Sequence, residues 1–196
     1  MQFAYRLFPA ITLAVLSTAS LAGSIFTSSS AFLANVGPGS YTETFNGLSN
    51  PSSGIFAGGA FGYTASAPNG IYVSGEFLGA SQVEDALTIT FTSGNVTALG
   101  ANFFATNISD AFQAHSLTLT LSDGTVTSFT PSSLSDSYRG FTTDVAISSL
   151  VISGTAGTSL YTGLDNLTVG VVPEPSTIAL MGVGLLGLRF LRRRAA

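Results

Sequence analysis

The sequence predicts an all-β protein, an antiparallel β-sandwich or jelly roll flanked by an N-terminal signal peptide and a C-terminal transmembrane helix. The 196 residues include 27 Ser, 23 Thr and 22 Gly, which are residues of low helix propensity. The 15 Phe and 6 Tyr supply the apolar material for a core, which a disordered chain lacks. Short segments in which apolar and polar residues alternate recur through the middle of the chain, as expected for half-buried strands.

The N-terminus has the features of a secretory signal peptide over residues 1–22. Arg6 supplies a positive charge, an apolar run follows, and Ser20 and Ala22 are small residues at the −3 and −1 positions of a cleavage site. An uncleaved membrane anchor and a buried strand are the alternatives, but the run is short and the small-residue site favours removal by signal peptidase. Residues 23–40 are rich in Ser, Gly and Ala, and we expect them to form a flexible leader.

Residues 41–172 are predicted to form the sandwich. The clearest strand pattern is Leu117–Leu121, where three Leu alternate with two Thr, and the Asp123-Gly124 pair predicts a hairpin after it. The turn residues Ser93-Gly94-Asn95 predict a second hairpin. We expect strands at residues 41–45, 55–63, 71–77, 87–91, 96–104, 117–121, 126–129, 140–143, 147–152 and 164–169. Their number and spacing favour a sandwich or jelly roll over a parallel α/β sheet.

Residues 173–196 combine three features in a fixed order. A triplet whose prolines enforce an extended chain comes first: Pro173, Glu174 and Pro175. Residues 176–191 then predict a transmembrane helix of about 24 Å at 1.5 Å per residue, which is short for a hydrocarbon core of about 30 Å. A basic tail follows, and the positive-inside rule keeps it in the cytoplasm: Arg189, Arg192, Arg193 and Arg194. This order predicts that residues 23–172 are exported.

The triplet, the short glycine-containing apolar segment and the terminal arginines resemble the PEP-CTERM sorting signal of Gram-negative bacteria. The resemblance implies recognition and cleavage near the triplet by exosortase, an integral membrane protease. It further implies a single-pass precursor in the inner membrane that later reaches the cell surface or the extracellular matrix, in association with exopolysaccharide and biofilm. An ordinary single-pass anchor that follows two prolines is the alternative.

The exported part carries a second resemblance, based on short motifs such as TFNGL at residues 44–48 and LDNLTV at residues 164–169. Their order resembles the domain found ahead of PEP-CTERM signals, which is similar to carbohydrate-binding jelly rolls. The resemblance implies a structural calcium ion between Glu43 and Asp165, to which Asn166 or Asn46 could add an amide oxygen. Alternatively, Glu43 is a solvated strand residue, and Asp165 and Asn166 only shape the turn into the last strand.

A sugar site is a further possibility of the exported part. Such a site combines an aromatic platform with amide and carboxylate groups, and the chain has no Trp. Tyrosines are then the candidates, with Asn69 or Arg139 near them in the sequence: Tyr63, Tyr72, Tyr138 and Tyr161. A tyrosine that simply lies half-buried at the end of a strand is the alternative for each.

Composition excludes several function classes. The chain has no Cys, so disulfide scaffolds, thiol catalysis and thiolate zinc sites are excluded. Residues 23–172 contain nine acids and one Arg, for a net charge of −8, which disfavours nucleic acid as a partner. The single histidine, His115, has no accompanying nucleophile motif. We therefore expect a non-enzymatic surface or matrix protein, with a carbohydrate-binding module and, less favoured, a glycan hydrolase as alternatives.

Overall fold

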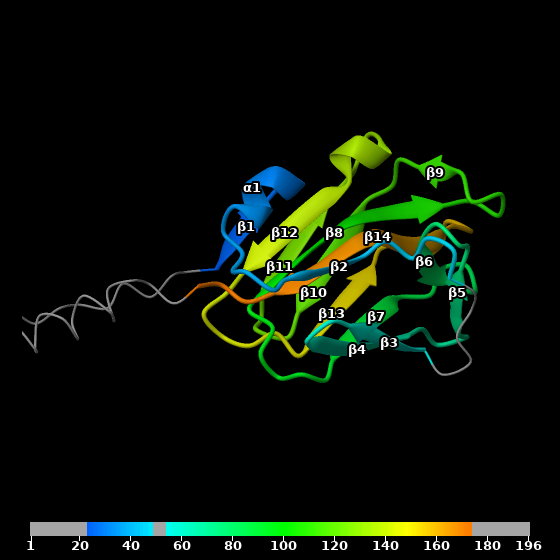
Figure 1. Cartoon of the computed structure of the whole chain (residues 1–196). Coiled ribbons are helices and arrows are strands. Elements are labelled where there is room, and N and C mark those ends of the chain that lie inside the picture. Colours follow the sequence, from blue (N-terminus) through cyan, green and yellow to red (C-terminus); the bar gives the residue numbers. More distant parts are fainter. Residues whose placement is uncertain (1–22, 49–53, 174–196) are drawn as a thin grey trace, which may run out of the picture.

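The computed structural model describes residues 23–48 and 54–173, which form two packed antiparallel sheets (Figure 1). Sheet A follows the order β1-β12-β8-β14-β6-β5, with β2 beside β14 and β9 beside β8. Sheet B follows the order β11-β10-β13-β7-β4-β3. The strands of sheet A are β1 (Ser24–Phe26), β2 (Tyr41–Glu43), β5 (Ile71–Val73), β6 (Leu78–Ala80), β8 (Ala98–Thr106), β9 (Phe112–Gln113), β12 (Tyr138–Thr142) and β14 (Tyr161–Gly170). The strands of sheet B are β3 (Ile55–Gly58), β4 (Phe61–Ser66), β7 (Leu87–Phe91), β10 (Leu117–Leu121), β11 (Val126–Phe129) and β13 (Ser149–Ser153). This architecture confirms the predicted all-β sandwich.

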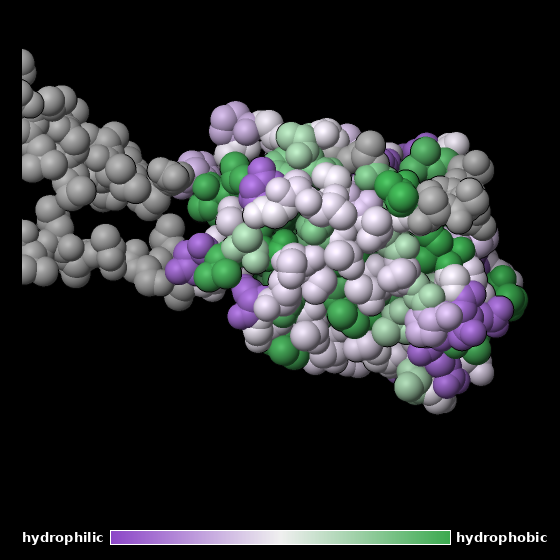
Figure 2. All heavy atoms as spheres, turned by 90° about the horizontal axis from the view of Figure 1, so that it is seen from below, coloured by the Kyte–Doolittle hydropathy of each residue, from purple (hydrophilic) through white to green (hydrophobic). Residues whose placement is uncertain are grey.

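The core lies between the inner faces of the two sheets and follows from the alternation in the sequence. Along β10 the three leucines are buried, whereas Thr118 and Thr120 are only partly buried. On the opposing sheet, Leu99, Ala101 and Phe103 of β8 and Leu164 and Leu167 of β14 belong to the same cluster of buried residues. The face shown in Figure 2 is mostly pale, of intermediate hydropathy, with scattered apolar and hydrophilic patches.

The hairpin predictions had different outcomes. The Asp123-Gly124 hairpin is confirmed, because β10 and β11 pair across it and Asp123 Oδ1 accepts a hydrogen bond of 2.8 Å from the Thr125 N–H. The hairpin predicted at Ser93-Gly94-Asn95 is wrong, because β7 lies in sheet B and β8 in sheet A. The turn carries the chain from one sheet to the other, and turn residues alone do not encode that choice.

Two predicted strands are divided in the structure. The segment 55–63 forms β3 and the start of β4, which pair with each other around a turn. The segment 71–77 forms only β5, and the following β6 folds back against it. Both breaks occur at glycines with positive φ, Gly59 (62°) and Gly75 (88°), a conformation that favours glycine.

The expectation of a flexible leader over residues 23–40 is corrected for residues 24–33. These residues form β1, which pairs with β12, and the short helix α1 (Ser29–Leu33). The Ser28 side chain caps α1 by accepting a hydrogen bond from the Ala31 N–H. Phe32 is fully buried in a second cluster with Ala98 and Tyr138, on the outer face of sheet A. The apolar residues of this segment stand in two short groups, Ile25-Phe26 and Phe32-Leu33, separated mainly by Ser and Thr, and this spacing gives too weak a periodic signal to predict the docking.

The two ends of the described domain lie together. Val172 N–H donates a hydrogen bond of 2.9 Å to Thr97 Oγ1, and the Thr143 N–H donates one to the Thr97 carbonyl. Gly23 lies beside Thr142 and Thr143. Both chain ends leave the sandwich at this end, whereas β5, β6 and β9 lie at the opposite end (Figure 1).

Candidate functional site

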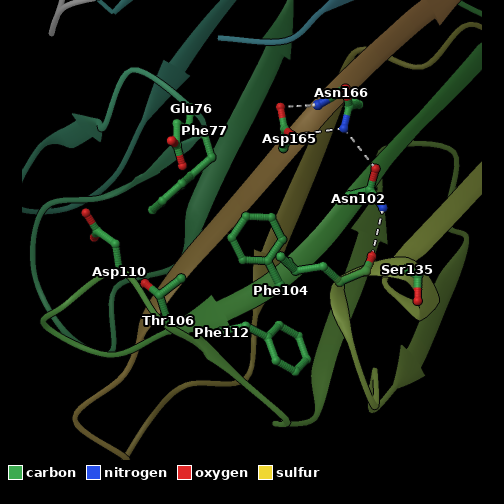
Figure 3. Close-up of a pocket in the computed structure, with 11 residues that line it drawn as sticks. Glu76, Phe77, Asn102, Phe104, Thr106, Asp110, Phe112, Ser135, Asp165 and Asn166 are labelled. Carbon is green, nitrogen blue, oxygen red and sulfur yellow. Dashed lines mark hydrogen bonds between the residues drawn. The ribbon is translucent and has the colours of Figure 1, made fainter. Parts of the chain in front are cut away.

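The candidate site is a groove on the outer face of sheet A, at the end opposite the two chain ends. Side chains alternate along β8, so that Asn102, Phe104 and Thr106 face away from the core. The neighbouring β14 contributes Asp165 and Asn166 on the same face. Loops cover the sides of the groove: the β5–β6 turn with Glu76 and Phe77, the β8–β9 turn, and the short 3-10 helix η1 (Leu134–Asp136) (Figure 3).

Aromatic rings form the floor of the groove. Phe77 and Phe104 meet edge to face at a centroid distance of 5.4 Å, and Tyr72 meets Phe77 edge to face at 6.2 Å. Gly79 and Gly163 pair across β6 and β14 beneath the Phe77 ring. A Cβ at residue 163 would lie 3.1 Å from the Phe104 ring and 3.3 Å from the Phe77 ring, so glycine is what lets the rings approach the sheet.

A row of polar side chains crosses the groove beside these rings. The ladder between β8 and β14 shifts register after Asp165, and Asn166 has a φ of 54°, a left-handed conformation that asparagine tolerates better than most residues. The Asn166 backbone N–H donates to Asp165 Oδ1 at 2.6 Å, and its side-chain amide donates to Asp165 Oδ2 at 2.9 Å and to Asn102 Oδ1 at 3.2 Å. Asn102 in turn donates to the Leu134 carbonyl and to Ser137 Oγ. The bulge therefore fixes the orientation of three polar side chains.

The groove consists of two adjoining hollows of about 360 and 230 Å³ that share Phe77, Thr106 and Asp110. The larger hollow alone, and the two together, fall within the volume range of small-molecule sites, from roughly 300 to 1,000 Å³. Burial, with the nearby Glu76 carboxylate, raises the pKa of Asp165, although the Asn166 N–H partly opposes the shift. The hollow around Asp165 is thus a partly desolvated, acidic site lined by aromatic rings.

The tyrosines predicted for a sugar site separate into two groups. Tyr72 and Tyr161 both line the smaller hollow, and Tyr72 donates a hydrogen bond of 3.1 Å to Asp110 Oδ2. Tyr138 is excluded from the site because it is buried against Phe32, and burial raises its pKa to about 12.

The other candidates for a sugar site also lie elsewhere. Tyr63 is buried in the main core, stacked on Phe56. Asn69 bonds to Asp85, and the Arg139 guanidinium carbon lies 3.9 Å from the centroid of the Phe129 ring. None of these three lines either hollow.

The structure does not bring the predicted calcium ligands together. Glu43 pairs with Leu167, whose side chain is in the core, and its carboxylate accepts hydrogen bonds from the Tyr41 hydroxyl at 2.7 Å and the Phe45 N–H at 3.1 Å. Asp165 faces the groove on the other side of the sheet. The bulge explains the difference, because it separates Asp165 and Asn166 from the part of β14 that pairs with β2. In the part of the chain that the structure describes, no group of three or more His, Cys, Asp or Glu is arranged to hold a metal ion.

Sequence reasoning missed most of the groove. Asn102 and Phe104 lie within a predicted strand, and their alternation with Ala101 and Phe103 would have placed them on one face. The η1 residues carry no such signal, because only the tertiary fold brings them over sheet A.

Only the first residue of the Pro-Glu-Pro triplet belongs to the described domain. Pro173 is its last described residue, and Gly37 N–H donates to the Val171 carbonyl at 2.8 Å just before it. Glu174, Pro175, the predicted helix 176–191 and the arginine tail lie outside the described residues, as does the predicted signal peptide. Across residues 23–48 and 54–173, no helix combines the length and apolar character needed to span a membrane.

Comparison with known proteins gives one match. Residues 171–194 match the family model described as the PEP-CTERM protein-sorting motif. No curated protein and no solved structure matches the chain. The matched range contains Pro173, Glu174, Pro175, the apolar segment and the arginines up to Arg194. The chain therefore carries a PEP-CTERM protein-sorting motif at its C-terminus, which indicates an exported protein that is processed by exosortase.

Proposed function

We propose that this protein is a non-enzymatic component of the bacterial cell surface or extracellular matrix, and that its sandwich binds exopolysaccharide in the groove on sheet A. The observation that carries the proposal is the combination in one hollow of the Phe77 and Phe104 rings with the fixed polar row of Asn102, Asp165 and Asn166. Apolar walls with a few oriented polar groups are typical of small-molecule sites. Ring faces and edges suit the C–H surfaces of sugars, and amides and carboxylates suit their hydroxyls.

The location of the groove agrees with delivery by the sorting motif. The chain leaves the sandwich at Pro173, beside β1 and α1, whereas the groove lies near β5, β6 and β9 at the other end (Figure 1). If the C-terminus is held at a membrane or transferred to a surface anchor, the groove faces away from that attachment. A bound polysaccharide then reaches the groove without contact with the anchor.

The export route is tested by fractionation and mass spectrometry of the protein from a host that has exosortase. We expect mature chains that begin at Gly23 and end near the Pro-Glu-Pro triplet. Replacement of Glu174 by Ala should leave the C-terminal segment attached. An intact C-terminus on the mature wild-type protein would contradict processing.

Binding is tested by a glycan array and by pull-down on native exopolysaccharide. The variants Tyr72→Ala and Tyr161→Ala should weaken binding, since both tyrosines line the groove. Val126→Ala is the matched control, because Val126 is an exposed apolar residue of sheet B. If the wild-type protein and the three variants all bind equally, the groove is not the binding site.

A glycan hydrolase is the second candidate, and one observation favours it. Glu76 and Asp165 line the same hollow, and glycosidases use two carboxylates, one of which has a raised pKa. His115 bonds to the Gly154 carbonyl at 2.7 Å, outside the groove, so it takes no part in this alternative. Release of reducing ends from a glycan panel, abolished by Glu76→Gln, would establish the hydrolase and overturn the non-enzymatic role.

A further inference from the structure

The amide groups in the larger hollow are already engaged within the protein. The Asn102 amide donates to the Leu134 carbonyl at 3.2 Å and to Ser137 Oγ at 3.0 Å, and these two acceptors are joined to each other by a hydrogen bond of 2.7 Å, so they lie on one side of the amide. Both hydrogens of the Asn166 amide are donated, to Asn102 Oδ1 and Asp165 Oδ2. Asn166 therefore has no amide hydrogen left for a ligand, and Asn102 has at most one.

Hydrogen-bond acceptors remain available in the same groove. A carboxylate has about four acceptor positions, and Asp165 uses two of them, both for Asn166. Asp110 accepts one bond, from the Tyr72 hydroxyl, through Oδ2. The exposed Glu76 adds a third carboxylate at the rim.

The charge of the groove has a single sign. Three of the described residues that line it are acidic, and none is Arg, Lys or His. Arg139 is the one arginine in residues 23–48 and 54–173, and it lies against the Phe129 ring while donating to the Asp136 and Tyr138 carbonyls. An anionic sugar in the groove would meet repulsion with no compensating cation.

An organic cation suits this arrangement better than a metal ion. In the residues that the structure describes, the groove carboxylates do not form a metal-binding cluster. An ammonium group offers three donors that can be shared between separated acceptors, and its hydrogen bonds to carboxylates are stronger than those between neutral groups.

We propose that the groove selects amine-bearing saccharides, such as polymers of glucosamine with free amino groups, over neutral and acidic polysaccharides. The inference rests on the proposed polysaccharide binding and specifies its ligand class. The amine would lie in the larger hollow between Asp165 and Glu76, with the sugar ring against Phe77 and Phe104. Nearby positive charge would also favour the ionised form of Asp165.

Isothermal titration of the full chain in detergent tests this preference. The probes are oligomers of equal length of glucosamine, N-acetylglucosamine and guluronate, which are cationic, neutral and anionic. We expect the glucosamine oligomer to bind about tenfold more tightly than the neutral one, because a hydrogen bond to a charged group is stronger than one between neutral groups. Added salt should reduce this advantage.

Three variants test the residues. Asp165→Asn and Glu76→Gln should each remove most of the preference for the amine while the neutral oligomer still binds. Glu76 is exposed, so its variant keeps the fold even if Asp165→Asn does not. Asp144→Asn is the matched control, because it removes one negative charge from a loop that does not line the groove.

The outcomes separate the inference from the proposed function. If the neutral oligomer binds as tightly as the amine, or the acidic one binds more tightly, the amine preference is overturned and polysaccharide binding stands. If Asp144→Asn weakens amine binding as much as Asp165→Asn, general charge attraction explains the data and the inference is overturned. If no saccharide binds, the proposed function and the inference both fail.

Discussion

The side-chain amide of Asn166 donates a hydrogen bond of 3.2 Å to Asn102 Oδ1, and this bond joins β14 to β8 across the groove. Asn166 can make the bond because the bulge places it in the left-handed region, with a φ of 54°. One irregular residue thus couples the backbone of the last strand to the polar row of the candidate site.

Substitution of Asn166 separates backbone strain from hydrogen bonding. Asn166→Ala and Asn166→Gly lose the same side-chain bonds, but only alanine places a Cβ in the left-handed conformation, at a cost of about 1 kcal/mol. We expect the alanine variant to be the less stable of the two by about that amount in denaturant unfolding. Equal stabilities would show that the bulge relaxes when the side chain is lost.

Gly163→Ala should destabilise the domain by about 1–3 kcal/mol. The added Cβ would lie 3.1 Å from the Phe104 ring and 3.3 Å from the Phe77 ring, so at least one ring must move. In a Phe77→Leu background the same substitution should cost less, and a double-mutant cycle measures the difference. Additive effects would show that Phe77 is not the residue that restricts position 163.

Phe32→Ala should destabilise the domain by about 3–5 kcal/mol, because the ring is fully buried against β8 and β12. A Cβ at Gly140 would lie 2.6 Å from this ring, which shows how closely it contacts the sheet. Leu33→Ala is the control, since its neighbouring side chain is 44% exposed and should change stability by less than about 1 kcal/mol. If both variants lower the free energy of unfolding in urea by the same small amount, residues 24–33 do not pack on the domain and form a leader instead.

Alkaline pH should unfold the domain through its buried tyrosines. Burial raises the pKa of Tyr138 to about 12 and also raises that of Tyr63, so the folded state retains protons that the unfolded state loses near pH 10. The contribution of these protonated tyrosines to the free energy of unfolding is fully present below about pH 10. It falls as pH rises toward 12, by up to roughly 3 kcal/mol for Tyr138.

Stability curves and ultraviolet titration of the phenols measure this effect. The variant Tyr138→Phe should show a smaller loss of stability between these pH values, because it has no phenol at that position to ionise. Titration of all tyrosines together near pH 10 in the native protein would contradict the assignment.

Local pattern was sufficient for much of the fold. The Leu-Thr alternation of Leu117–Leu121 and the Asp123-Gly124 turn depend on neighbouring residues alone, and both are confirmed. The pattern could not say that β7 and β8 lie in different sheets, because a turn after Phe91 is compatible with either connection. Local pattern also could not predict the packing of Phe32 on sheet A, because this packing depends on the absence of side chains at Gly100 and Gly140.

The sequence by itself determined the sorting motif, because the Pro-Glu-Pro triplet, the apolar segment and the arginines are recognised as a contiguous order of residue types. It also determined the sandwich, because alternation with period two is a local property of strands. Only the tertiary structure decided the site. It placed Tyr72 and Tyr161 in the groove, buried Tyr138, and put Glu43 and Asp165 on opposite faces of sheet A. The physical reason is that the groove forms from residues distant in sequence. Which of these residues meet in it depends on strand register and on one bulge in β14.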